Sequence, residues 1–126
     1  MATKMEMIKE FHEKFGLEYN GPPRRLPLEL ENFRIEFMQE EVNEYDSAFL
    51  VEQLDALVDL VYVAMGTAYL HGFDFDEAFR RVHEANMKKK RSVGTILSGR
   101  GSAYDVVKPE GWEPPFLDDL VRNNDT

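Results

Sequence analysis

Apolar residues over the first ninety positions recur at the three- and four-residue spacing of amphipathic helices. Glycine and proline interrupt this periodicity: Gly16 follows the first apolar segment, Pro22 and Pro23 precede the second, and Gly72 follows the third. Because the links between the later segments are short, we expect consecutive helices to pack as antiparallel neighbours. The pattern predicts four helices, over residues 5–15, 28–49, 51–71 and 74–90.

The last third of the chain has a different character. Glycines and prolines between Gly94 and Pro115 break any long periodicity, so we expect residues 92–126 to form an extended, loop-rich tail. A short helix is expected near its end, at residues 116–121, and Trp112 is expected to hold the tail by burial. A chain of 126 residues is large enough for one proper core. The predicted fold class is therefore all-α, a four-helix core with a loop-rich tail in one domain, 1–126.

Acidic residues gather on the two central predicted helices. Glu40, Glu41 and Glu44 fall within an arc of about 100° on the first of them. Asp55 and Asp59 are four residues apart on the next helix and share a face. If the turn between the helices is centred within residues 48–51, Glu41 and Glu44 come level, within about one helical turn, with Asp59 and Asp55. The sequence thus predicts a patch of up to five carboxylates.

Two interpretations of this patch remain open. Like charges at close range raise one another's pKa, and no lysine or arginine lies between Arg34 and Arg80 to offset them. A divalent cation would do so, and ligands that are all oxygen suit Mg²⁺, Mn²⁺ or Ca²⁺. The alternative is a solvated acidic face, which most glutamate runs on helices form. The apolar neighbours of Asp55 and Asp59 favour the metal site, because an unpaired carboxylate among them would be costly.

Composition and charge exclude several other classes. The chain has no cysteine, and therefore neither disulfides nor zinc–thiolate sites. Its net charge of −9 argues against general binding to nucleic-acid backbones. The sequence contains no run of ~18 apolar residues, so it predicts no membrane span. The N-terminus lacks the apolar segment of a signal peptide, and we expect a cytoplasmic protein.

The carboxylate pattern resembles that of the all-α nucleoside triphosphate pyrophosphohydrolases, a superfamily that includes MazG-like, dimeric dUTPase-like and phosphoribosyl-ATP pyrophosphohydrolase-like proteins. In that superfamily a Glu-Glu-x-x-Glu helix is followed by a Glu-x-x-Asp helix, and together they hold Mg²⁺. The first motif matches Glu40, Glu41 and Glu44, and Asp59 matches the final aspartate. The chain departs from the pattern at Ala56, where the glutamate is expected, and Asp55 would be its substitute.

The resemblance implies an enzyme that hydrolyses a ribo- or deoxyribonucleoside triphosphate to the monophosphate and pyrophosphate with Mg²⁺, or Mn²⁺ in its place. Its implied partners are the nucleotide and a second copy of the chain, as a homodimer or a dimer of dimers. Glu41 is the expected general base, with Glu44 as the alternative. The implied metal ligands are Glu40, Glu41, Glu44, Asp55 and Asp59.

Residues expected to contact the substrate are spread along the chain. The segment from His83 to Lys89 resembles a phosphate-binding helix end of one subgroup, and the segment from Lys108 to Pro115 resembles that subgroup's tail. Structural roles compete with each assignment, because tyrosine commonly packs in a core and cations at a helix C-terminus complement its dipole. A single histidine on a helix is usually an ordinary surface or half-buried residue. The expected substrate contacts are His12, Tyr62, Asn86, Lys89, Arg91 and Lys108.

Two rival readings use the same helices. In the first, the chain is a non-catalytic interaction module with a degenerate metal site, and Ala56 favours that reading. In the second, the bundle holds two iron or manganese ions. That site requires Glu-x-x-His ligand pairs, which the third predicted helix lacks.

Overall fold

The computed structural model describes residues 1–92 and 99–122 and confirms a mostly helical fold. Its helices are α1 (Lys4–Lys14), α2 (Leu28–Tyr45), α3 (Leu50–His71) and α4 (Phe75–Asn86). The chain forms two compact units: Met1–Phe75 joined by the described residues from Leu120 onward, and Asp76–Asp119. The expectation of one domain stays a prediction. Within the described ranges, no single helix combines the length and apolarity needed to cross a membrane.

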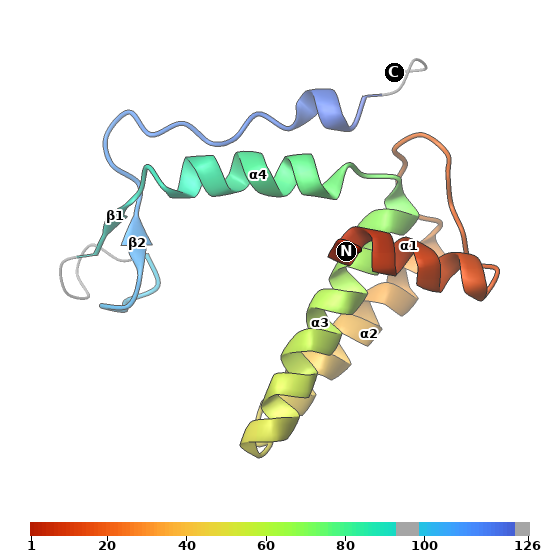
Figure 1. The fold of residues 1–126 in the computed structure, drawn as a ribbon. Coiled ribbons are helices and arrows are strands. Elements are labelled where there is room, and N and C mark those ends of the chain that lie inside the picture. The colour runs from red at the N-terminus through yellow and green to blue at the C-terminus, as the bar shows by residue number, and fades with distance from the viewer. Residues whose placement is uncertain (93–98, 123–126) are drawn as a thin grey trace. The chain divides into compact units, whose positions relative to one another are not determined.

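The first unit is built on the antiparallel pair of α2 and α3, and α1 packs against α3 (Figure 1). Local sequence sets the helix ends. The Thr3 hydroxyl accepts a hydrogen bond from the Glu6 N–H at 3.1 Å and caps α1. The Glu52 carboxylate accepts the Phe49 N–H at 3.1 Å at the start of α3. Gly72 ends α3 at φ 76°, a left-handed conformation that suits glycine.

Two helices are shorter than the periodicity predicts. The end of α2 is Tyr45 rather than residue 49, because Asp46 is extended and Ser47 adopts φ 70°. The end of α4 is Asn86 rather than residue 90, because the chain turns there and enters a strand. Apolar residues that continue a helical spacing past a turn cannot reveal that the backbone has changed direction.

The core of the first unit lies at one end of the helix pair. It joins α1, the loop before α2 and the C-terminal half of α3, through Ile8, Leu26, Met65, Tyr69 and Leu70. The N-terminal half of α3 contributes little to it. Apolar side chains there stay exposed, including Leu54 at 64%, Leu57 at 47% and Val58 at 54%. Asp55, expected among buried neighbours, is consequently exposed as well.

A half-buried arginine joins the two long helices. Arg34 on α2 donates from Nε to the Thr67 hydroxyl at 3.0 Å and from Nη2 to the Val63 carbonyl at 2.9 Å. Gly66 makes room for this contact. A Cβ atom at Gly66 would lie 2.7 Å from Arg34 Nη2 and 3.2 Å from Cε1 of the buried His12.

The second unit combines α4 with a returning tail (Figure 1). A two-residue strand, β1 (Lys90–Arg91), pairs antiparallel with β2 (Val106–Val107), a small sheet that the helical pattern did not predict. The helix expected at residues 116–121 is a short 3₁₀ turn, η1 (Asp118–Leu120). Trp112 is half-buried and donates its indole N–H to the Ala85 carbonyl at 2.8 Å, which confirms its expected anchoring role.

We expect Gly66→Ala to lower the free energy of unfolding by about 1 kcal/mol, measured by urea denaturation. Alanine gains up to about 1 kcal/mol of helix propensity over glycine. The displaced guanidinium loses two charge-assisted hydrogen bonds, which together are worth more. Gly99→Ala is the control, because a Cβ there meets nothing within 4 Å. A Gly66→Ala protein that is more stable than wild type would show that the Arg34 side chain can move away without lowering the free energy of unfolding.

Candidate metal centre

The pairing of α2 with α3 brings three carboxylates together. Glu41 and Glu44 lie three residues apart on one face of α2, and Asp59 faces them from α3. One oxygen atom from each of the three lies within 4.8 Å of the others. The prediction that carboxylates from the two central helices meet is therefore confirmed for this group of three.

Glu41 is the buried member of the group. It is only 7% exposed, and its Oε2 atom has no hydrogen-bond partner among the described residues. Asp59 is half-buried and Glu44 is exposed. In the part of the chain that the structure describes, no ion pair compensates any of the three. The site thus holds a buried acceptor without a donor, which is costly in a protein interior.

The electrostatics follow from this geometry. Burial raises the pKa of Glu41, and the nearby charges of Glu44, Asp59 and Asp55 raise it further. Burial also raises the pKa of Asp59, helped by Asp55 and Glu44. Desolvation and like charge act in the same direction, because both disfavour the ionised form.

The donor set fits a hard divalent cation. Carboxylate oxygens are the ligands that Mg²⁺, Mn²⁺ and Ca²⁺ prefer, and the cluster contains neither sulfur nor imidazole. A cation would give Glu41 Oε2 the partner it lacks and would remove the repulsion within the group. Glu41, Glu44 and Asp59 are the residues that could hold it.

The two other predicted ligands lie outside this group of three. Glu40 and Asp55 are exposed, although Asp55 is close enough for its charge to raise the pKa of Glu41 and Asp59. Ala56, which occupies the position of the expected glutamate, is only 2% exposed. The chain therefore has no carboxylate at that buried position. Asp55, at the preceding position, acts on the group of three through its charge.

His12 and Tyr62 occupy different surroundings from those of the carboxylates. His12 is buried, its Nδ1 atom lies 2.9 Å from the Ile8 carbonyl, and its ring packs 4.6 Å from that of Tyr69. Tyr62 meets the Phe11 ring edge-on at 5.5 Å. It also lines an apolar groove of about 470 Å³ between α1 and α3. His12 is thus part of the core, and Tyr62 is accessible.

The remaining predicted contacts belong to the second unit. Asn86 is the exposed last residue of α4, and Arg91 is exposed on β1. Lys89 and Lys108 each place Nζ near the Trp112 ring, at 5.2 and 5.1 Å from its centroid.

Sequence reasoning missed the role of Arg34, which the pattern shows only as the last cation before the acidic stretch. It lies seven residues before Glu41, on the same face of α2, and its burial lowers its pKa. Arg34 ties α2 to α3 two turns from the carboxylates and so helps to set their spacing. Gly66, a glycine inside a long apolar helix, is the one sequence signal of this close contact.

An antiparallel helix pair that holds uncompensated carboxylates is the arrangement expected for an all-α nucleotide pyrophosphohydrolase. The family model for phosphoribosyl-ATP pyrophosphohydrolase matches residues 8–86, from α1 to the end of α4. The chain belongs to this family, which is part of the all-α nucleoside triphosphate pyrophosphohydrolase superfamily. It is accordingly a hydrolase that acts on phosphoric anhydrides. No curated protein shows significant similarity to the chain.

We expect Glu41→Gln to raise the melting temperature in EDTA, and more at pH 8 than at pH 4. The folded-state pKa of Glu41 is raised, so the folded protein binds the proton more tightly than the unfolded chain does. Stability is therefore fully present below the unfolded pKa and is lost as the pH rises through the folded pKa. Glutamine removes that loss. Thermal melts across this pH range provide the measurement.

Glu36→Gln is the matched control, because Glu36 is an exposed glutamate on the same helix. It should leave the pH dependence of the melting temperature unchanged. Equal shifts for both variants would mean that the net charge of the chain, rather than the burial of Glu41, governs the effect.

Proposed function

We propose that the chain is a Mg²⁺-dependent nucleoside triphosphate pyrophosphohydrolase that releases pyrophosphate and leaves a nucleoside monophosphate. The observation that carries this proposal is the group formed by Glu41, Glu44 and Asp59, whose oxygens lie within 4.8 Å of one another. The family match supports the reaction class, because its description names a pyrophosphohydrolase of a nucleotide.

The carboxylates serve two roles, and Glu41 takes part in both. The residues that would hold Mg²⁺ or Mn²⁺ are Glu40, Glu41, Glu44, Asp55 and Asp59. The bound metal neutralises phosphate charge and makes a water molecule more acidic. Glu41 takes the proton from the attacking water, and Glu44 is its alternative in this role. The support for Glu41 is its burial together with its raised pKa, which brings a carboxylate nearer to the range of an effective base.

Polar groups of the second unit contact the phosphates in this proposal. Asn86, Lys89, Arg91 and Lys108 supply amide and cationic donors, which hold phosphate oxygens as charge develops. Tyr62 offers an accessible ring against the base. His12, buried beside Tyr69, would support the substrate from within the core rather than from an exposed surface.

In this proposal the triphosphate defines the substrate class. The nucleoside or phosphoribosyl-nucleoside attached to the triphosphate does not define it. Phosphoribosyl-ATP, the substrate in the family's description, carries the same anhydride as an ordinary ribo- or deoxyribonucleoside triphosphate. Glu41, Glu44 and Asp59, through the metal that they would hold, act on that anhydride. The substrate panel therefore includes phosphoribosyl-ATP together with the common triphosphates.

We also propose that the chain functions as a homodimer or a dimer of dimers. The support is the exposed apolar side of α3, where Leu57 is 47% and Val58 54% exposed. Together with Val61 and Met65 these residues line the apolar groove beside α1. A continuous apolar surface of this kind on one face is typical of an association site.

The first measurement is pyrophosphate release from the panel with Mg²⁺ and with EDTA. We expect release with Mg²⁺ only, and a loss of at least about 100-fold in Glu41→Gln, the usual effect of removing a general base. Glu36→Gln should retain wild-type activity, since it removes the same charge from the exposed side of α2. If wild type and Glu41→Gln release equally little from every substrate, the chain is a non-catalytic interaction module.

We expect wild-type protein to behave as a dimer in light scattering after gel filtration, and Val61→Asp to shift it toward monomer. A carboxylate in the apolar groove would lose its hydration on association. Burying an unpaired charge in this way costs on the order of several kcal/mol. Tyr104→Asp introduces the same charge at a position that is 95% exposed in the second unit. A dimer that survives Val61→Asp would place the interface elsewhere.

A further inference from the structure

The strand register of the second unit brings two lysines opposite each other. In the antiparallel ladder, Lys90 pairs with Val107 and Arg91 with Val106. One position further along the same register, Lys89 comes opposite Lys108. These residues are far apart in sequence, and the two-residue sheet is what aligns them.

Trp112 holds this lysine pair together. Nζ of Lys89 lies 5.2 Å from its ring centroid and Nζ of Lys108 lies 5.1 Å from it. The ring attracts each ammonium group and leaves its hydrogen-bond donors free for another acceptor. Two like charges on one ring repel each other, so an anion between them would stabilise the arrangement.

Within residues 1–92 and 99–122, neither lysine forms an ion pair with a carboxylate. Glu110 and Glu113 line a hollow beside Trp112 without reaching ion-pair distance of either lysine. Lys88, Lys90 and Arg91 add further positive charge to the same segment of a chain whose net charge is −9. Positive charge is therefore concentrated here in an otherwise acidic protein, which favours an anionic ligand.

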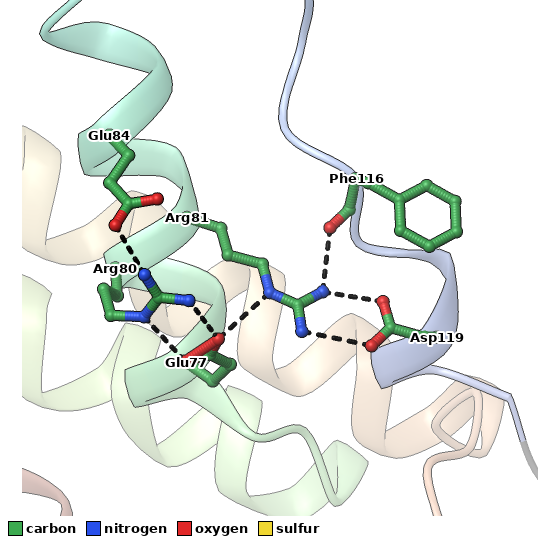
Figure 2. Close-up of polar contacts among 6 residues, drawn as sticks. All are labelled: Glu77, Arg80, Arg81, Glu84, Phe116 and Asp119. Atoms are coloured by element: carbon green, nitrogen blue, oxygen red, sulfur yellow. Dashed lines mark hydrogen bonds and ion pairs between the residues drawn. The ribbon is translucent and has the colours of Figure 1, made fainter.

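A second ion-pair network anchors the segment that carries Lys108 and Trp112. Arg81 on α4 binds both carboxylate oxygens of Asp119, the longer contact being 3.1 Å, and donates to the Phe116 carbonyl at 3.0 Å (Figure 2). Glu77 accepts from both Arg80 and Arg81 (Figure 2), and these arginines lower the pKa of Glu77 to about 2. With the Trp112–Ala85 hydrogen bond, these contacts fix the segment along α4.

We propose that residues 106–119 form a strap that places Lys108 beside Lys89 as a two-ammonium site for the pyrophosphate part of the substrate. Arg81 is a positioning residue, because it acts on Lys108 only through Asp119 and the strap. This inference rests on the proposed function for the identity of the ligand. It adds how the second cation is positioned, which residues hold it there, and which part of the substrate it contacts.

The test is the fluorescence of Trp112, the only tryptophan, during titration of the full chain with inorganic pyrophosphate in EDTA at about 0.15 M salt. We expect a saturable change in emission as the anion draws the ammonium groups away from the ring. Lys108→Gln should weaken pyrophosphate binding by about tenfold, the effect of one charge-assisted hydrogen bond. Lys108→Arg should restore most of it.

Lys90→Gln is the matched control, because it removes one charge from the neighbouring ladder position without touching Trp112. It should change binding by less than about twofold. Asp119→Asn should weaken binding in the wild-type background and have no further effect when combined with Lys108→Gln. A general loss of folding would not produce that dependence on Lys108.

The strap proposal is overturned if emission does not saturate, or if Lys90→Gln weakens binding as much as Lys108→Gln does. It is also overturned if Asp119→Asn acts equally in both backgrounds. Failure of the proposed function is a separate result: Glu41→Gln would then match wild type in hydrolysis while the Trp112 titration stays intact. Conversely, Mg²⁺-dependent hydrolysis with no effect of Lys108→Gln would remove the strap proposal and leave the enzyme.

Discussion

The main constraint on the first unit is that it must hold three carboxylates that repel one another. Glu41, Glu44 and Asp59 are held within 4.8 Å of one another only because α2 and α3 pack side by side. Arg34 ties the same helices together through Thr67 and Val63, and the core residues of α3 lie at that end. Packing at one end of the helix pair therefore offsets the repulsion among the carboxylates at the other end. Binding of a cation would add its own free energy to the folded state.

The two units carry opposite chemistries. The first holds a group of acidic residues that no cation pairs with, and the second holds Lys89 and Lys108, which form no ion pair with any carboxylate of the described ranges. Each chemistry suits a nucleotide ligand, because metal-binding carboxylates and cationic side chains both serve phosphate groups. The family match ends at residue 86, so it covers the carboxylates but not Lys89 or Lys108. The ladder and the strap therefore lie outside the part of the chain that the family match covers.

The exposed side of α3 has a bearing on the same site. Its apolar residues surround Asp55 and continue toward the groove beside α1. If a second copy covers that surface, the carboxylates become more buried, and the repulsion within the group increases. Dimer formation and metal binding are then expected to favour each other, because the cation offsets a cost that association raises.

Local patterns in the sequence determined the helices and the meeting of the carboxylates. Helical spacing depends on neighbours three and four positions away, so it predicts the four helices and places Glu41 and Glu44 on one face. A short turn then brings Asp59 opposite them. The resemblance of this pattern to a known superfamily indicated the reaction class, which the family match supports.

Other features were decided only by contacts between distant residues. Asp55 and Glu41 are both carboxylates beside apolar residues, yet one is exposed and the other buried, because burial depends on which helix faces pack. The role of Arg34 becomes visible only through its hydrogen-bond partners on α3. A two-residue strand is too short to carry a pattern, so the register that joins Lys89 to Lys108 exists only in the folded chain. Tertiary structure decides such features because their free energy comes from pairings that the local sequence does not contain.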